Sequence, residues 1–179
     1  MTHKCKFLCL LVIGTFGLAG ASADIMVDLM PAHSTIDPVG ATTDVCIVAD
    51  IPEADAILGW GLDLTPDNPM IASITGVAIN TALFDAISSP DGDDLGGLAF
   101  PECVWGEDVL LATVTFTGWE LGYTGLVLSD DYPDDLTEGF ALCEQGFATV
   151  YYGDGSIEVV PEPASLSLLA LGLLALRRR

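Results

Sequence analysis

Between Lys6 and Arg177 the sequence contains no Lys or Arg, although the whole chain has 26 Asp and Glu residues. All of these acids except Glu162 lie between residues 24 and 160. This segment therefore cannot form a Lys or Arg salt bridge, and its stability must come from side-chain packing and backbone pairing. Repulsion among the carboxylates predicts that salt or bound cations stabilise it. Nothing in it can neutralise phosphates, which excludes nucleic acid and anionic lipid surfaces as partners.

The sequence also lacks the motifs that mark most enzymes. It has no G-x-S-x-G elbow, no ligand cluster with zinc spacing, and no Gly-rich phosphate loop after a strand. His33 and Ser34 are adjacent in sequence, but a general base must face its nucleophile through the fold. Carboxylate pairs for glycoside hydrolysis are inevitable among so many acids and therefore carry no information. We predict that the protein is not an enzyme.

Cysteine is scarce, and only Cys46, Cys103 and Cys143 lie between residues 24 and 160. An odd number in an exported chain permits at most one internal disulfide. Cys103 and Cys143 are the favoured pair, because both lie near the ends of expected strands with turn residues close by. The alternative is that all three are small buried apolar residues.

Long apolar runs are absent, and the two moderate runs lie at the ends of the chain. Residues 1–23 have a basic start at Lys4 and Lys6, an apolar run over residues 7–19, and small residues from Ala21 to Ala23. This order is typical of a secretory signal peptide, and we predict cleavage after Ala23. The alternative is an N-terminal membrane anchor, for which the run is short against the roughly 20 residues of a spanning helix.

The C-terminal segment, residues 161–179, consists of a proline-rich motif, an apolar run over residues 164–176, and a basic end. The residues of the motif and the basic end are Pro161, Glu162 and Pro163, then Arg177, Arg178 and Arg179. This segment resembles the PEP-CTERM sorting signal of bacteria. The resemblance implies recognition by an exosortase-type membrane transpeptidase and delivery to the cell surface or the extracellular matrix.

The apolar run of this tail would be about 20 Å long as a helix, against a hydrocarbon core of roughly 30 Å. Transient retention in the membrane through this helix, followed by processing, fits that length better than permanent anchoring. Local thinning of the bilayer would also allow a span, and an ordinary C-terminal anchor is the alternative.

The segment between the two signals, residues 24–160, has the length of one domain. Gly, Pro, Asn and Asp clusters interrupt it every 8 to 12 residues or so, which is an all-β pattern. Only residues 80–87 could form a helical turn. The expected strands are residues 25–30, 44–49, 56–65, 71–78, 95–100, 108–117, 125–129, 139–143, 147–152 and 156–160.

Alternation of residue types assigns faces to two of these strands. Leu58, Trp60, Leu62 and Leu64 share one side, which we predict to be the core side, and Gly59, Gly61, Asp63 and Thr65 take the other side. Likewise Leu110, Ala112, Val114 and Phe116 are predicted to point inward, and Thr113, Thr115 and Thr117 outward. Two amphipathic strands of this kind imply two packed sheets.

Residues 44–50, 58–67 and 109–116 resemble, in pattern, order and spacing, strands of the cohesin-type sandwich. The resemblance implies a single two-sheet, jelly-roll-like β-sandwich of about nine strands in the carbohydrate-binding superfamily. It does not imply dockerin binding, since no accompanying scaffold repeat is visible in the chain.

Two acidic loops could supply the six to eight or so oxygen ligands that calcium takes, although neither fits an EF-hand loop. The alternative for each loop is a solvated acidic turn. The candidate ligands are Asp91, Asp93 and Asp94 in the first loop and Asp130, Asp131, Asp134 and Asp135 in the second.

Three aromatic residues, Trp105, Trp119 and Tyr132, lie in turn-like contexts and could form an exposed carbohydrate-binding platform. Their alternative place is the edge of the core. The function that the sequence supports best is an exported, non-enzymatic surface or matrix protein associated with exopolysaccharide. The second function is a carbohydrate-binding module assisted by calcium.

Overall fold

The computed structural model describes residues 24–87, 94–144 and 146–162. Several predicted features lie outside the described residues: the signal peptide with Ala21 and Ala23, the acids Asp91 and Asp93, and the tail from Pro163 to Arg177, Arg178 and Arg179. In the part of the chain that the structure describes, no helix is long and apolar enough to cross a bilayer.

The described chain forms strands and one short 3-10 helix, which agrees with the all-β prediction. In chain order the elements are β1 (Ile25–Met30), β2 (His33–Ile36), β3 (Thr42–Ile51), η1 (Glu53–Asp55), β4 (Ile57–Gly61), β5 (Asp63–Pro66), β6 (Ala72–Ile79), β7 (Asp85–Ala86), β8 (Gly96–Leu98), β9 (Gly106–Gly118), β10 (Gly122–Ser129), β11 (Gly139–Leu142), β12 (Val150–Tyr152) and β13 (Gly155–Val159). The sequence missed β2 and β7, which are too short to show a period, and it predicted a helical turn where β7 lies.

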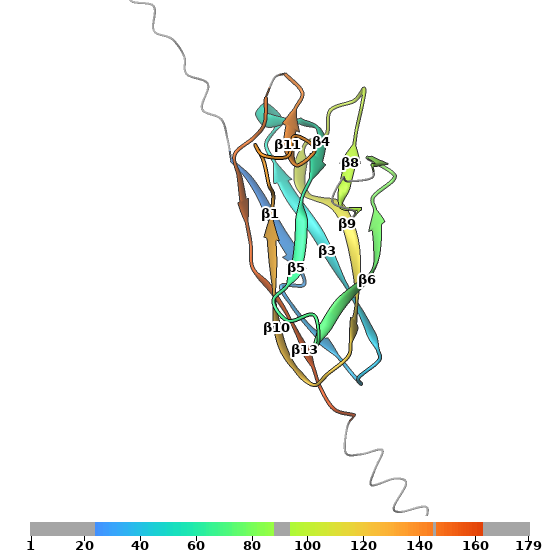
Figure 1. Cartoon of the computed structure of the whole chain (residues 1–179). Helices are drawn as coiled ribbons and strands as arrows, with labels where there is room; N and C mark the ends of the chain where they lie inside the picture. The colour runs from blue at the N-terminus through green and yellow to red at the C-terminus, as the bar shows by residue number, and fades with distance from the viewer. Residues whose placement is uncertain (1–23, 88–93, 145, 163–179) are drawn as a thin grey trace, which may run out of the picture.

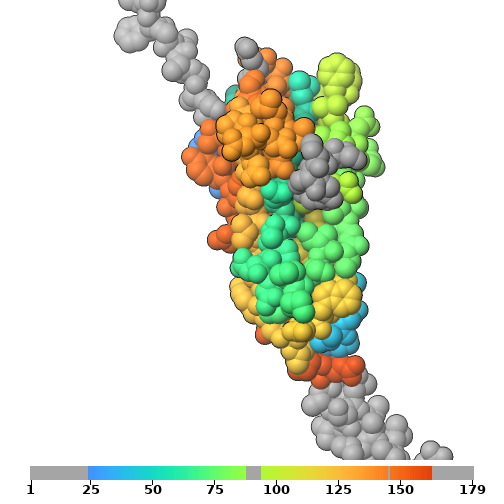
Figure 2. Space-filling model, viewed as in Figure 1, coloured from blue at the N-terminus to red at the C-terminus, as the bar shows by residue number. Residues whose placement is uncertain are grey.

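These strands form a sandwich, elongated along its strands (Figure 1). One sheet has five strands in the order β12-β1-β3-β9-β6, and two four-stranded sheets have the orders β2-β13-β10-β5 and β11-β4-β8-β7. The first two strands of the domain pair with the last two, β1 in parallel with β12 and β2 in parallel with β13. The described chain begins near one end of the long axis and finishes at the other (Figures 1 and 2).

A single hydrophobic cluster fills the sandwich, and every member of it lies between Ile25 and Val159. Trp60 is 2 % exposed and meets Phe84 edge to face, with ring centroids 5.9 Å apart. Its predicted core position is therefore correct. Because the whole cluster lies within one segment, we expect a fragment of residues 24–162 to fold by itself.

The predicted strand over residues 56–65 is in fact two strands, β4 and β5, which belong to different sheets. Gly59 and Gly61, which were predicted to take the side opposite Trp60, are both buried. A Cβ on Gly61 would collide with the backbone oxygen of Thr137, and one on Gly59 would lie 3.1 Å from the backbone oxygen of Gly97. Both sides of β4 are thus covered, one by side chains and the other by backbone.

The predicted faces of β9 hold from Ala112 to Thr117 and fail at Leu110. A register shift against β3 between Ile47 and Val48 turns Leu111, rather than Leu110, into the core. At the other end Thr117 pairs with Ser73 on the outer side, where it is nevertheless covered, and its Oγ1 lies 2.9 Å from Thr75 Oγ1. A β-bulge inserts one residue and reverses the alternation, which a strict period of two does not anticipate.

Cys103 and Cys143 form a disulfide, with their Cα atoms 6.1 Å apart. Cys46 is a free, half-buried thiol whose Sγ lies 3.8 Å from Thr113 Oγ1. The bridge joins the segment before β9 to the end of β11. Both segments contact the start of β4, because Ile57 pairs with Val104 on one edge and with Leu142 on the other.

Candidate functional site

A cleft of about 720 Å³ lies at the end of the molecule where the described chain begins. Its walls are Asp24, residues 50–53 at the end of β3 and just after it, and residues 105–108 at the start of β9 and just before it. The Trp105 side chain is 55 % exposed and forms part of the wall. The cleft thus combines an accessible indole with a set of carboxylates.

The backbone around this cleft is fixed by one side-chain contact. The Asp108 N–H donates to Asp50 Oδ1 at 2.8 Å, which ties the start of β9 to the end of β3. Asp108 has a φ of 49° and so lies in the left-handed region, which Asp tolerates better than most residues. Next to it, the register of β3 against β9 shifts between Ala49 and Ile51. This irregular end of the sheet opens the cleft.

The chemical character of the cleft follows from its side chains. Asp24, Asp50, Glu53, Glu107 and Asp108 offer hydrogen-bond acceptors, and none of the lining side chains is cationic. The indole offers an apolar face that can stack on a ring of C–H groups. A neutral ligand with an apolar face and several hydroxyl donors fits this combination.

Trp119 lies at the opposite end of β9 from Trp105 and cannot share a platform with it. The 13 residues of β9 separate the two, which is about 40 Å at the usual rise of a strand. Trp119 is 51 % exposed, and its Nε1 donates to Ser73 Oγ at 2.8 Å. It lies near the end where the described chain finishes, because the neighbouring Gly118 closely approaches Val159.

Tyr132 belongs to a third place, the acidic turn between β10 and β11. Its ring stacks on Phe147 with centroids 4.2 Å apart, so one face of the ring is already occupied. The structure therefore does not bring the three predicted aromatic residues together. Of the three, only Trp105 lines the large cleft.

The carboxylates of the acidic turn are directed at neighbouring groups of the turn and of β12. Asp130 accepts hydrogen bonds from the Tyr132 N–H and from the Tyr152 hydroxyl. Asp135 Oδ1 accepts from the Thr137 N–H at 2.8 Å and from its hydroxyl at 2.7 Å. The Asp131 and Asp134 backbones are linked by a hydrogen bond of 2.8 Å between the Asp134 N–H and the Asp131 carbonyl.

Within the described ranges, no three His, Cys, Asp or Glu side chains are placed so that they could hold a metal ion together. The geometry of the second loop therefore lends the calcium hypothesis no support. Of the candidate ligands in the first loop only Asp94 is described, with a φ of 61°.

The hydrogen bond from the Tyr152 hydroxyl to Asp130 also affects titration of the tyrosine. Burial of Tyr152, and then this bond, raise the pKa of its hydroxyl far above the usual value.

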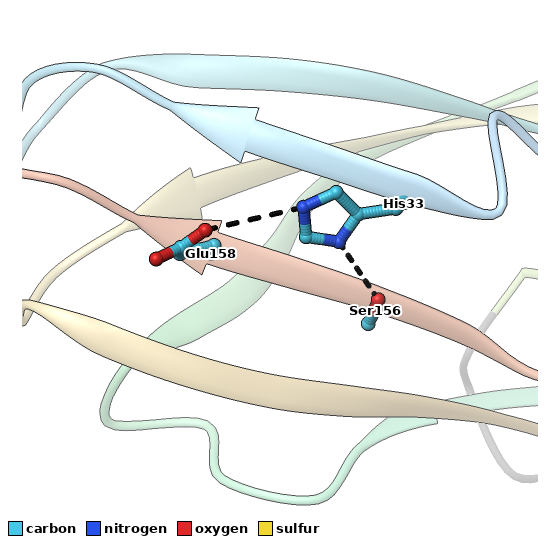
Figure 3. A network of polar contacts seen from close by, with 3 residues as sticks. All are labelled: His33, Ser156 and Glu158. Atoms are coloured by element: carbon cyan, nitrogen blue, oxygen red, sulfur yellow. Dashed lines mark hydrogen bonds and ion pairs between the residues drawn. The ribbon is translucent and has the colours of Figure 1, made fainter.

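The sequence missed a polar cluster on the outer face of β2 and β13, which Figure 3 shows as His33, Ser156 and Glu158. His33 Nδ1 lies 3.0 Å from Ser156 Oγ, and His33 Nε2 lies 4.0 Å from Glu158 Oε2. The imidazole also stacks against Tyr123, with ring centroids 6.4 Å apart. Tyr123 was missed because the expected strand began at residue 125, whereas β10 begins at Gly122.

Ser156 and His33 resemble a catalytic nucleophile and its base only in the distance between Ser156 Oγ and His33 Nδ1. The His33 and Glu158 side chains are 53 % and 51 % exposed, so the cluster lies on an open strand surface. A nucleophilic serine also needs donors aimed at a developing oxyanion and a site that excludes water. The large cleft beside Trp105 is lined by other residues and does not include His33, Ser156 or Glu158.

Residues 159–179 match the PEP-CTERM protein-sorting motif, which confirms the resemblance predicted from the sequence. The motif indicates an exported protein that is sorted by an exosortase and retained transiently at the membrane through its C-terminus. No curated protein matches the chain.

The solved structures to which the chain is similar include several cohesin modules. The cohesin module of a Clostridium perfringens family 33 glycoside hydrolase has a TM-score of 0.58 at 8 % identity, covering 78 % of this chain and 97 % of that one. The seventh ScaB type I cohesin of Pseudobacteroides cellulosolvens has a TM-score of 0.55 at 15 % identity, covering 78 % and 94 %. A type I cohesin–dockerin complex of Clostridium thermocellum has a TM-score of 0.54 at 12 % identity, covering 77 % and 93 %. At these identities the similarity shows a shared fold, the cohesin-like β-sandwich.

Proposed function

We propose that this chain, with its PEP-CTERM motif and cohesin-like sandwich, is a non-enzymatic component of the cell surface or extracellular matrix that associates with exopolysaccharide. An N-terminal signal peptide of residues 1–23 would direct export. An exosortase-type transpeptidase would then process the chain near Pro161, Glu162 and Pro163. The acidic sandwich of residues 24–160 is the part that acts after delivery.

The Trp105 cleft is the observation that carries the binding part of this proposal. A half-exposed indole leaves apolar surface in contact with water, which is unfavourable. A ligand that covers this surface gains the free energy of removing it from water. Sugar rings present C–H faces that stack on indole, and their hydroxyl groups can donate to the surrounding carboxylates. Because these carboxylates repel polyanions, the polysaccharide that fits is neutral, or has its charges covered by cations.

The position of the cleft supports the same function. Asp24 is part of its wall, whereas Val160 N–H bonds to the Ile36 carbonyl at the far end of the molecule, where the tail leaves. A chain held at the membrane by its C-terminal segment would therefore present the cleft away from the bilayer. Trp119, which lies beside the exit of the tail, would face the membrane.

A protein partner is the second candidate. It is favoured by the solved neighbours, one of which is a cohesin in complex with a dockerin. The exposed apolar side chains on the outer face of β10, Tyr123 and Val127, would be available to such a partner.

The test is retention of the 24–162 fragment on exopolysaccharide from the producing cells, compared with an equally acidic β-protein. We expect specific retention, and we expect Trp105→Ala to reduce the affinity at least tenfold, as is usual for an aromatic anchor. Trp119→Ala is the matched control, because it removes a similarly exposed indole from the other end, and it should leave retention unchanged. Equal retention of Trp105→Ala and the original fragment would contradict the assignment of the cleft.

The same columns run with calcium and with a chelator test the calcium-assisted form of the proposal. Loss of retention in chelator would support a calcium-dependent module. Retention in both conditions leaves polysaccharide binding in place and removes calcium from it. If no retention is seen in either condition, the polysaccharide function is wrong and the protein-partner candidate takes its place.

A further inference from the structure

Strand β6 is unlike the other edge strands of the described domain. The remaining edges, β2, β5, β7, β11 and β12, have two to four residues each, whereas β6 has eight. Its sequence from Ala72 to Ile79 contains no charged residue and no proline. Natural sheets usually protect a long edge with charges, prolines or a covering segment, because an open edge offers unpaired backbone groups to another strand. Strand β6 itself supplies no such charge or proline, and the carboxylate that lines the groove beside its second half is that of Asp94.

The core is also incompletely covered along this edge. Ile74, Val77 and Ile79 pack against the hydrophobic cluster but remain half-buried. A groove of about 370 Å³ runs beside the second half of the strand, with Val77, Ile79 and Ile87 in its walls. In Figure 2 the green surface of this region lies at the margin of the molecule. A strand added here would cover apolar side chains as well as pair its backbone.

The bulge in β6 makes the strand complementary to itself. Opposite β9, the residues Ala72, Ile74, Val77 and Ile79 face core residues, and the register shifts between Ile74 and Gly76. The inward residues are therefore even-numbered before the shift and odd-numbered after it. Two copies paired antiparallel over the full strand place Ile74 opposite Val77, and Ala72 opposite Ile79, with all four side chains on the inner side. Without the bulge, this pairing would set inward residues against outward ones.

From this geometry we propose that β6 pairs antiparallel with β6 of a second copy of the chain, across a two-fold axis between Thr75 and Gly76. On the outer side Ser73 faces Ala78 of the second copy. At the axis, Gly76 has no side chain and leaves room for Thr75 of the second copy. The two sheets of five strands thereby become one continuous sheet across the dimer.

Electrostatics determine when this dimer forms. No like charges face each other within the pair, since the strand has none, but residues 24–162 contain all 26 Asp and Glu residues of the chain and no Lys or Arg. Repulsion between the two bodies is screened over roughly 10 Å at 0.1 M salt and 3 Å at 1 M salt. One added strand also buries less than the roughly 1,200–2,000 Å² of a stable interface. The dimer is therefore weak, and salt strengthens it.

The test measures sedimentation velocity of the 24–162 fragment over a range of concentrations at about 0.1 M and 1 M salt. We expect a monomer–dimer equilibrium that shifts toward dimer at high salt. Hydrogen exchange should show that the β6 amides become protected as the concentration rises. A monomer at every concentration in both salts, or a dimer whose β6 amides exchange as in the monomer, would overturn the proposal.

Two double variants test the register with a matched background. Ser73→Lys with Ala78→Lys sets like charges directly opposite each other at two places, whereas Ser73→Lys with Ala78→Glu sets opposite charges there. Both variants lose the hydrogen bond from Trp119 to Ser73, so their folding is compared first by melting temperature. The Lys/Lys pair carries less negative net charge than the Lys/Glu pair, and would dimerise better if overall repulsion alone decided.

We expect the opposite order, with at least tenfold weaker dimerisation of the Lys/Lys variant than of the Lys/Glu variant. Equal dimerisation of the two variants would show that this pairing is wrong. Association of the fragment with an unrelated extended peptide in place of a second copy would likewise refute the self-pairing. The proposal does not depend on polysaccharide binding, because Trp105→Ala leaves the β6 edge intact.

Discussion

Removing the disulfide between Cys103 and Cys143 should destabilise the domain by about 4 kcal/mol. The two cysteines are 40 residues apart in sequence, and closing a loop of that length restricts the unfolded chain by about this free energy. The folded state should change little, because backbone bonds already hold both segments to β4. The Val104 N–H donates to the Ile57 carbonyl and the Cys143 N–H to the Ala56 carbonyl, each at 2.9 Å.

The assay is urea unfolding of the 24–162 fragment, followed by tryptophan fluorescence, for the original sequence and for Cys103→Ala with Cys143→Ala. The midpoint should fall, and the slope m should rise slightly because the unlinked denatured chain exposes more surface. Cys46→Ser is the control. It removes the free thiol, forms no bridge in either case, and should change the free energy of unfolding by less than about 1 kcal/mol.

A free energy of unfolding within about 1 kcal/mol of the original would refute the reasoning, since it would mean that the bridge does not restrict the unfolded chain. A second measurement on the same double variant tests the rigidity of Trp105 in the cleft. Trp105 lies two residues after Cys103, so the double variant should retain the fold but hold Trp105 less rigidly. Faster quenching of its fluorescence by acrylamide would report this.

Tyr152→Phe should make the stability of the domain less sensitive to alkaline pH. The raised pKa of Tyr152 stabilises the folded state fully below the usual tyrosine pKa near 10, and this stabilisation is lost as the pH rises above that value. The loss is at most about 1.4 kcal/mol per pH unit, and it is smaller here because the ring is only partly buried. Thermal unfolding between neutral and strongly alkaline pH measures it, and parallel profiles for Tyr152→Phe and the original would show that the raised pKa of Tyr152, caused by burial and by the bond to Asp130, contributes nothing to stability. Gly97→Ala should lower the free energy of unfolding by about 1–3 kcal/mol, because the new Cβ would lie 2.8 Å from Trp60 Nε1. Gly76→Ala should lower it less, because its Cβ meets only ordinary contacts. Chemical denaturation measures both, and the reverse ranking would show that the core around Gly97 can shift. The melting temperature should rise with sodium chloride, since the described residues contain no Lys or Arg; a melting temperature independent of salt would show that the carboxylates do not repel enough to matter.

Much of the fold could be predicted because its signals are local. The bounds of β1 coincide with the expected strand, since six residues there alternate between buried and exposed without interruption. Trp60 was placed in the core by the same alternation. Three cysteines allow at most one bridge, and the turns near Cys103 and Cys143 favoured that pair. The structure confirms a disulfide between these two residues.

The errors arise where a distant segment determines the local structure. Gly61 is buried because the backbone at Thr137 passes against it, and no local pattern contains that contact. Leu111 replaces Leu110 in the core because the bulge is a property of β3 and β9 together. A period of two shows which residues share a side of a strand. It does not show what lies against that side.

The candidate site was only partly predictable for the same reason. In the sequence, Trp105 and Trp119 have equal standing as aromatic residues in turns. The 13 residues of β9 separate them, and only Trp105 lies among carboxylates contributed by other segments, such as Asp24 and Glu53. Tyr123 was missed for a local reason, since glycines on both sides of it made the start of β10 resemble a turn.

The proposed pairing of β6 has a consequence for when the protein can dimerise. Antiparallel pairing reverses the direction of the long axis, so the ends near Val159 of the two copies point in opposite directions. Two copies held in one membrane by their C-terminal tails point the same way and cannot pair in this manner. Dimerisation should therefore follow release from the membrane. With Cys46→Ser as background, Thr75→Cys places two thiols beside the axis and should form a crosslinked dimer in released protein, but not in precursor retained by an altered motif such as Glu162→Ala. Crosslinking of the retained precursor to the same extent would rule out the antiparallel arrangement.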